Sequence, residues 1–352
     1  MSFPLEPPIR PMLGKLARRF PTTDGLRFEP KWDGFRTLVF RDGDELYLQS
    51  RDGKPLARYF PELLDPLRAA LPDRCVVDGE IVVARPHGLD FADLQLRLHP
   101  AASRVRTLSG ELPASVVLFD LLADDINRCS ERFADRRALL ETAVRPNRTV
   151  RLTPSTPDPV LAHEWFERFE GAGLDGVMAK DPESPYEPGK RTMLKVKHER
   201  TADVVVAGFR WHKSGPVVGS LLLGLWGTDG RLQHVGVAAS FTVKRRKELV
   251  YELAPLREGA LDGHPWADWA SRDVAHWRQP GMQSRWSAGK SLQWEAIRAE
   301  RVAEVRYGHL QGTRFRHTAH FLRWRPDRDP ASCTYGQLDV VAPAVLEQVF
   351  GT

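Results

Sequence analysis

A lysine followed by an acid and a glycine is the part of this chain best suited to covalent chemistry. Residues 31–34 have the sequence Lys-Trp-Asp-Gly, with Glu29 two positions before Lys31 and Arg36 two positions after the glycine. A lysine attacks an electrophile only after its ammonium has lost a proton, so its surroundings must favour the neutral amine. Asp and Gly suit a turn whose backbone approaches a ligand closely. Taken alone, the pattern also fits an exposed hairpin turn.

Four more side chains with possible chemical roles follow along the chain. Arg51 lies on a Ser-Arg-Asp-Gly turn, and Glu80 follows Asp-Gly at an expected strand break. Phe119 is placed at the end of an apolar strand, and Asp175 opens an acid-glycine turn. Carboxylates of this kind are candidates to lie near Mg²⁺ or the hydroxyls of a ribose. The alternatives are that Glu80 only caps a turn and that Phe119 only fills the core.

Three lysines lie within two expected strands of the same region. Lys180 ends the strand 177–180, while Lys195 and Lys197 are two positions apart and therefore share a strand face. They could be solvated strand positions. Like charges brought together destabilise a fold unless an anion neutralises them, and a triphosphate would do so. The three lysines therefore favour a phosphate site.

The elements that must position these residues alternate without a regular βαβ rhythm, which predicts an α+β fold. Helices are expected over 131–144 and 160–171. Hydrophobic alternation and turn residues predict strands over 37–40, 46–48, 75–77, 81–83, 115–122, 177–180 and 193–197.

The character of the chain changes near residue 200. Residues 200–352 hold 21 Lys and Arg against 15 Asp and Glu, whereas residues 1–199 hold 30 against 31. The second segment is thus the more suitable to face a polyanion, although a solvated basic face is the alternative. Its expected elements are strands over 203–211, 220–226, 232–238 and 291–307, a strand near residue 315 and one helix over 244–256. Such a set suits a small barrel of the OB type. The domains are accordingly expected at 1–199 and 200–352.

Composition narrows the class of protein. The chain has 352 residues, 42% of them hydrophobic and 28% charged, as in folded globular proteins. No apolar run approaches the ~18 residues of a membrane span. Cys75, Cys129 and Cys333 are too far apart for a zinc finger. We therefore expect no membrane association, no structural zinc and a cytoplasmic location.

Together, these segments resemble the motifs of the covalent nucleotidyltransferases, and specifically of the ATP-dependent DNA ligases. Two further segments, the loop 186–191 and residues 314–317 shortly before the last motif, extend the resemblance. They are similar to segments of the small ligase C proteins of actinobacteria and of the ligase module of bacterial ligase D. The six motifs, in family order, resemble residues 31–34, 50–53, 119–122, 175–180, 194–197 and 325–328.

The resemblance implies three phosphoryl transfers that use ATP and Mg²⁺ or Mn²⁺. Lys31 takes AMP from ATP, and the AMP then passes to the 5′-phosphate of nicked double-stranded DNA. The 3′-hydroxyl finally displaces the AMP. A hinge over 198–202 would let the barrel domain close over the site. The resemblance implies that Glu29 and Phe119 recognise the adenine, that Arg36, Arg51 and Glu80 hold the ribose and nearby phosphate, and that Lys180 contacts the adenine or a phosphate. Lys195 and Lys197 would contact the α-phosphate, and Glu80 and Asp175 would hold the metal. Pyrophosphate would be oriented by Arg325, Asp327 and Arg328.

Three positions depart from the family pattern. Asp175 stands where glutamate is usual, Met193-Leu194 replaces an aromatic residue, and Arg328 replaces a lysine. The resemblance also implies a monomer that acts in DNA repair at the nucleoid, with a repair polymerase or an end-binding protein as a possible partner. The alternatives are an RNA ligase, a GTP-dependent capping enzyme or a non-catalytic nucleic-acid-binding module.

Overall fold

A computed structural model describes residues 4–17, 19–21, 23–85, 88–270, 293–308 and 310–338. The chain divides into two compact units, one formed by the described residues up to His198 and the other by those from Glu199 to Leu338. None of the helices described is long and apolar enough to cross a membrane.

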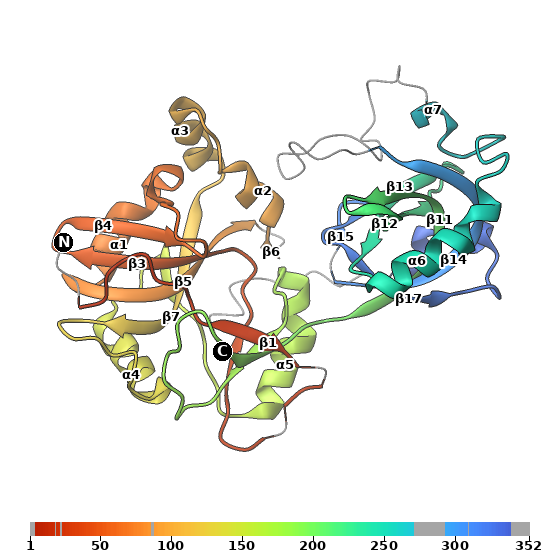
Figure 1. The fold of residues 1–352 in the computed structure, drawn as a ribbon. Helices are drawn as coiled ribbons and strands as arrows, with labels where there is room; N and C mark the ends of the chain where they lie inside the picture. Colours follow the sequence, from red (N-terminus) through yellow and green to blue (C-terminus); the bar gives the residue numbers. More distant parts are fainter. Residues whose placement is uncertain are drawn as a thin grey trace. The chain divides into compact units, whose positions relative to one another are not determined.

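Two sheets form the first unit (Figure 1). In the six-stranded sheet, β6 (Gly88–Leu89) pairs with β5, and the remaining order is β4 (Glu45–Ser50), β3 (Phe35–Asp42), β5 (Arg74–Arg85), β7 (Ala114–Ala123) and β8 (Val150–Leu152). The four-stranded sheet has the order β1 (Leu13–Leu16), β10 (Arg191–Val196), β9 (Val177–Lys180) and β2 (Arg27–Pro30). The expected α+β character is confirmed, and β1 is a strand that the hydrophobic pattern did not predict.

Both helices expected in this unit are present. Helix α4 spans Phe133–Ala143 and α5 spans Pro159–Phe169. Asp158 caps α5 by accepting the backbone N–H of Val160, and Pro159 occupies the first turn, where its missing N–H costs nothing. Trp165 and Phe169, four residues apart, pack with Phe28 of β2 in one buried cluster. Three shorter helices also occur: α1 (Leu64–Ala70), α2 (Phe91–Leu96) and α3 (Ala102–Glu111).

The expected strand break at residues 78–80 is wrong. β5 runs through these residues without interruption and pairs with β3 from Arg74 to Ile81. The Asp-Gly-Glu segment is tolerated because Gly79 lets β7 pass close, since a Cβ there would lie 2.7 Å from the carbonyl oxygen of Val117. Phe119 likewise lies inside β7 rather than at its end.

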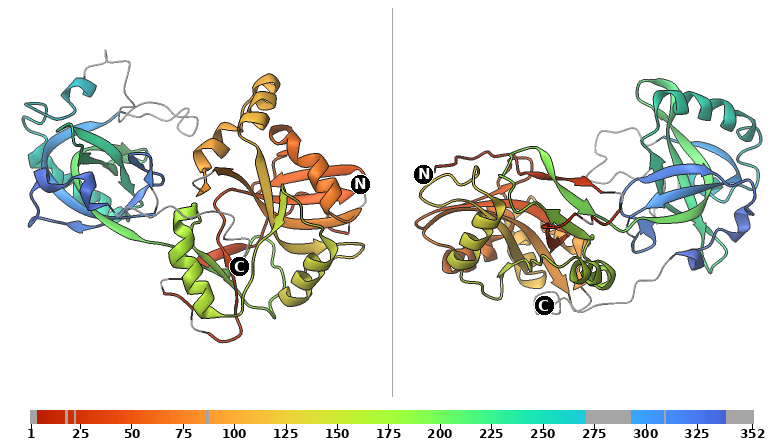
Figure 2. Two further views of the ribbon diagram at one scale, coloured as in Figure 1. Left: turned by 180° about the vertical axis from the view of Figure 1, so that it is seen from behind. Right: turned by 90° about the horizontal axis from the view of Figure 1, so that it is seen from below.

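The second unit is a closed five-stranded barrel with one main helix, which confirms the expected OB-type architecture (Figure 2). α6 (Val243–Leu253) is capped by Thr242, and α7 (Ala267–Ala270) and the pair β15 (Leu310–Gln311) and β16 (Arg314–Phe315) complete the elements. The barrel strands follow the order β11 (Arg200–His212), β12 (Gly215–Trp226), β13 (Leu232–Ala239), β17 (Ala319–Trp324) and β14 (Glu295–Tyr307).

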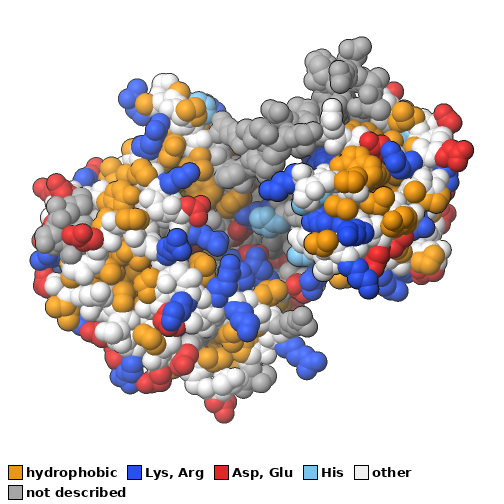
Figure 3. Space-filling model, viewed as in Figure 1, with side chains coloured by type: hydrophobic (Ala, Val, Ile, Leu, Met, Phe, Trp, Pro, Cys, Tyr) orange, Lys and Arg blue, Asp and Glu red, His pale blue; other side chains and the backbone are white. Residues whose placement is uncertain are grey.

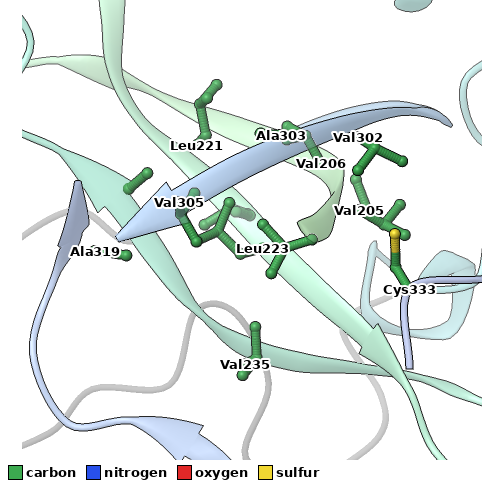
Figure 4. Close-up of a cluster of buried hydrophobic side chains, with 14 of the residues drawn as sticks. Val205, Val206, Leu221, Leu223, Val235, Val302, Ala303, Val305, Ala319 and Cys333 are labelled. Atoms are coloured by element: carbon green, nitrogen blue, oxygen red, sulfur yellow. The ribbon is translucent and has the colours of Figure 1, made fainter. Parts of the chain in front are cut away.

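Small and branched side chains fill the barrel. Val205, Leu223, Val235 and Val305 are completely buried and come from four different strands (Figure 4). Alternate positions of each strand face inward, so every strand contributes to one core. This core is independent of the clusters in the first unit.

Candidate active site

Lys31 lies on the connection from β2 of one sheet to β3 of the other. Its backbone N–H donates to the carbonyl of Gly176 at 2.8 Å, and its carbonyl accepts the N–H of Asp175 at 2.9 Å. Gly34 then bends the chain into β3, and a Cβ at this position would overlap the carbonyl oxygen of Ile81. The first motif is therefore held at both ends by backbone contacts.

Asp175 joins Lys31, Lys195 and Lys197, whereas Lys180, which was also expected at the phosphate site, pairs with Glu29. The ammonium of Lys31 lies 2.6 Å from Oδ2 of Asp175, and Lys197 contacts the same oxygen. Lys195 lies near them: burial lowers its pKa, and the positive charges of Lys197, Lys31 and Arg191 lower it further. Three lysines thus surround one carboxylate, which leaves a positive site suited to an anion.

Glu29 and Lys180 form a second, more buried pair. Their side chains are separated by 2.6 Å, and both are almost fully buried. Lys180 also lies 4.9 Å from the ring centre of Phe119, which makes it a cation–π partner. Glu29, Phe119 and Lys180 therefore meet, as expected for residues that share one part of a ligand.

Arg137 also contacts Glu29, a role that the sequence analysis missed. Its guanidinium lies 3.2 Å from Oε1 of Glu29 and donates to the carbonyl of Thr153 at 2.6 Å. A signal was available, because Arg137 is placed on the same helical face as the buried Phe133 and Leu140. A charged residue at such a position needs a buried partner.

Arg36 is held by a second buried carboxylate. Its guanidinium contacts both oxygens of Asp78 at 2.6 Å, and Asp78 is completely buried. The hydroxyl of Tyr186 donates to Asp78 at 2.7 Å, and burial raises the pKa of that phenol. The guanidinium carbon of Arg36 lies 4.4 Å from the ring centre of Phe119. Sequence reasoning missed the roles of Asp78 and Tyr186.

Glu80 pairs across the strands with Arg36 and belongs to the same site. Burial raises the pKa of Glu80 to about 7, while the charges of Arg36 and Lys31 and a hydrogen bond from the N–H of Gly34 oppose the rise. Glu80 is therefore a carboxyl group that a nearby cation would ionise fully at neutral pH.

Four of the expected residues are not part of this cluster. Arg51 lies on the exposed turn after β4, beside a groove of about 560 Å³. The other three belong to the second unit. There, Arg325 pairs with Asp203 at 3.0 Å and Asp327 at 2.7 Å, and Arg328 lies 3.3 Å from Asp203. The hydrogen bond from Arg325 lowers the pKa of Asp327 to about 2.

Glu80 and Asp175 are the carboxylates that the sequence analysis proposed for a metal, and Asp175 is already paired with Lys31 and Lys197. Within the described part of the chain, no group of three or more His, Cys, Asp or Glu side chains forms a metal cage. Mg²⁺ at nucleotide sites takes one or two protein carboxylates and fills its other positions with phosphate oxygens and water. Glu80 fits a cation that binds together with a nucleotide, whereas Asp175 already holds two lysines.

Two family models match this chain. The model described as "ATP dependent DNA ligase domain" matches residues 11–197, and the model described as "ATP dependent DNA ligase C terminal region" matches residues 214–328. The first match contains the Lys31 site, and the second contains Arg325, Asp327 and Arg328.

Curated proteins and solved structures agree with these matches. The chain is 52% identical over 348 residues to DNA ligase C of Mycobacterium tuberculosis, and the alignment covers 96% of both chains. It is 53% identical over 345 residues to DNA ligase C2 of Mycolicibacterium smegmatis, again covering 96% of both. A solved structure from a study of Lig E DNA ligases has the same fold, with 18% identity, a TM-score of 0.55, and coverage of 89% of this chain and 98% of that one.

Proposed function

The chain belongs to the ATP-dependent DNA ligase family, and from this we propose that it seals nicks in DNA through an AMP adduct on Lys31. The observation that carries the assignment of Lys31 is its ammonium, which shares one oxygen of Asp175 with Lys197. A phosphate that enters this cluster gains positive charge on several sides, next to a lysine amine positioned by a rigid backbone.

Membership of the ligase family implies three transfers at this site. Lys31 gives a proton to the paired Asp175, and its amine then attacks the α-phosphorus of ATP, so that a phosphoramidate bond forms and pyrophosphate leaves. The AMP then passes to the 5′-phosphate of the nick and frees Lys31. The 3′-hydroxyl attacks that activated phosphate, AMP leaves and the phosphodiester is restored. Phosphoryl transfer depends mainly on position and on neutralised charge, which the lysines supply.

The side chains divide between the parts of the nucleotide. Glu29 and Lys180 recognise the adenine, and Phe119 stacks on it, while Arg137 orients Glu29. Lys195 and Lys197 neutralise the α-phosphate. Arg36, Arg51 and Glu80 remain assigned to the ribose and nearby phosphate.

Mg²⁺ or Mn²⁺ would be held by Glu80 and Asp175 together with phosphate oxygens. Its contribution would be to neutralise charge on the phosphates. Glu80 suits this role because its raised pKa of about 7 would fall beside a cation.

We assign an adenylation domain to residues 1–199 and an OB-fold domain to residues 200–352. We assign Arg325, Asp327 and Arg328 of the second domain to the departing pyrophosphate. The hinge expected over 198–202 is narrowed to His198 and Glu199, because residues 200–202 are paired with β14. The protein acts as a monomer in DNA repair at the nucleoid, and a repair polymerase or an end-binding protein is its partner.

Intact-mass measurement tests the proposal. The purified protein is incubated with ATP and Mg²⁺, and a gain equal to one AMP at Lys31 is expected, whereas Lys31→Ala should stay unmodified and folded. A gain with GTP instead of ATP would point to a capping enzyme. An adduct that persists on Lys31→Ala would overturn the assignment of the nucleophile.

A further inference from the structure

A groove in the first unit is separate from the lysine cluster. Its volume is about 560 Å³, and none of the lysines assigned to the nucleotide lines it. One wall is the N-terminal strap, residues 8–13, and the other is formed by the turn 51–53 and Gly189. Figure 3 shows Lys and Arg side chains gathered over the middle of the face of this unit that carries β1.

Two arginines give this groove its charge. Arg10 of the strap and Arg51 of the turn are both exposed and both line it. Among the described residues, neither makes an ion pair with a carboxylate. Asp52 is the acidic residue of the lining, so the net charge of the residues that line the groove is positive. Two guanidinium groups without acidic partners are available to an anion from outside.

The strap that carries Arg10 is fixed by buried hydrogen bonds before any ligand arrives. The side-chain amide of Gln49 accepts the N–H of Ile9 at 2.9 Å and donates back to its carbonyl. The hydroxyl of Tyr186 accepts the N–H of Met12 at 3.0 Å. Gln49 and Tyr186 are both buried, so the strap is held on either side of Arg10.

The backbone of Arg10 itself is held as well. The carbonyl of Arg10 accepts the N–H of Gly189 at 3.0 Å. At the end of the strap, the N–H of Leu13 donates to the carbonyl of Lys190 at 2.7 Å. A charged group on a fixed backbone loses less conformational freedom when it binds. Arg10 is thus placed on a rigid edge rather than on a free terminal segment.

The rest of the lining indicates which kind of anion fits. Pro8, Ile9, Pro11 and Leu13 flank Arg10 along the strap and make that wall of the groove mainly apolar. A sugar–phosphate backbone has this alternation of apolar sugar and charged phosphate, and arginines on phosphates set the register of a protein on DNA. A free nucleotide would instead need contacts to its base.

We propose that the groove between the N-terminal strap and the turn 51–53 binds the sugar–phosphate backbone of the nicked duplex, with Arg10 as a phosphate contact. This proposal rests on the proposed function, because it names the surface that holds the DNA substrate. It also extends the role of Arg51, which then serves the DNA strand as well as the nucleotide.

Step-resolved assays with Arg10→Ala test this surface. Binding of the adenylylated enzyme to a nicked duplex with a dideoxy 3′ end should weaken about tenfold at moderate salt, and the slope of log affinity against log salt should fall by about one unit. Sealing of a pre-adenylylated nick should slow similarly at low DNA concentration, whereas adenylylation of Lys31 by ATP should keep its rate. Arg10→Lys should retain most of the affinity because it keeps the charge.

Arg148→Ala is the matched control. Arg148 is an exposed arginine of the same unit outside the groove, and its removal should change neither affinity nor slope. Unchanged DNA affinity and salt slope in Arg10→Ala would overturn the proposal, as would an equal loss in Arg148→Ala. If Arg10→Ala instead loses adenylylation while folded, the groove belongs to the nucleotide and the proposal fails. Failure of the proposed function would appear differently, as a wild-type protein that gains no AMP.

Discussion

At the scale of single residues, one oxygen of Asp175 receives the ammonium groups of both Lys31 and Lys197. Asp175 stands where the family usually has glutamate, one methylene longer. The shorter side chain still reaches both lysines, and its own N–H is bonded to the carbonyl of Lys31.

Replacement of this carboxylate by a neutral amide should misplace the nucleophile. We expect Asp175→Asn to slow single-turnover adenylylation by about 100-fold, the scale for a small displacement of a reacting group. Asp175→Glu is the matched control, and it should keep most of the rate because its charge remains. Wild-type rates in Asp175→Asn would mean that Lys31 does not depend on this pair.

The raised pKa of Glu80 makes folding stability depend on pH. The native carboxyl keeps its proton up to about pH 7, against an ordinary value of 4.5, so the native state binds more protons than the unfolded state between these values. Stability therefore declines as pH rises through this window. Glu80→Gln removes the effect, and its melting temperature relative to wild type should be higher at about pH 8 than at about pH 5.

Calorimetry at the two pH values checks this prediction. Glu6→Gln, which removes an exposed carboxylate, should show no such change with pH. A constant difference between Glu80→Gln and wild type would mean that Glu80 titrates alike in the native and unfolded states.

At the scale of elements, glycines let neighbouring strands approach closely within each sheet of the first unit. A Cβ at Gly34 would overlap the carbonyl of Ile81, and one at Gly176 would overlap the carbonyl of Val196. These glycines therefore set the path of the backbone on which Lys31 and Asp175 lie. Residues with a side chain would push the strands apart.

An added methyl group at the contact between Gly34 and Ile81 should disturb both folding and chemistry. Gly34→Ala should lose about 1–3 kcal/mol of unfolding free energy, the range for overpacking, and its adenylylation should fall beyond the loss of folded protein. Gly110→Ala is the control, since α3 leaves open space there and alanine favours a helix by about 0.5–1 kcal/mol. Chemical denaturation measures the unfolding free energy of both variants. Equal stability of Gly34→Ala and Gly110→Ala would contradict the close contact between Gly34 and Ile81.

At the scale of the whole molecule, the sixth motif belongs to the barrel unit and is organised there. Asp203 of β11 pairs with both Arg325 and Arg328, and the backbone N–H of Asp203 is bonded to Gln337. The guanidinium groups are thus positioned by the barrel itself. The proposed closing of the two domains then delivers a preformed cationic motif.

The position of the sixth motif in the barrel unit predicts that its loss slows adenylylation and nick sealing to different extents. Arg325→Ala should slow adenylylation by about 100-fold, the scale for removing one positioned donor, but should slow sealing of a pre-adenylylated nick much less. Arg323→Ala, which removes an exposed arginine paired with Glu304, is the control and should change neither step. Equal losses in both assays for Arg325→Ala would argue against the closing model.

The chemistry of the short motifs and the architecture of the barrel unit can be predicted from local sequence. The short motifs around Lys31, Asp175 and Lys195 indicated the chemistry, because the spacing of side chains along a strand or turn is a local property. The barrel unit was predicted for the same reason, since alternating residues and glycine turns mark its strands.

Other features were decided only by tertiary structure. The continuity of β5 through residues 78–80 depends on pairing with β3 and β7, and the strap depends on Tyr186, which is 174 residues away from Met12. Asp78, Arg137 and Tyr186 entered the site because they satisfy buried charges and hydrogen bonds of distant segments. A side chain's type and spacing state what it can bond to, whereas its actual partner is set by packing of segments far apart in the chain, where a buried polar group without a partner is costly.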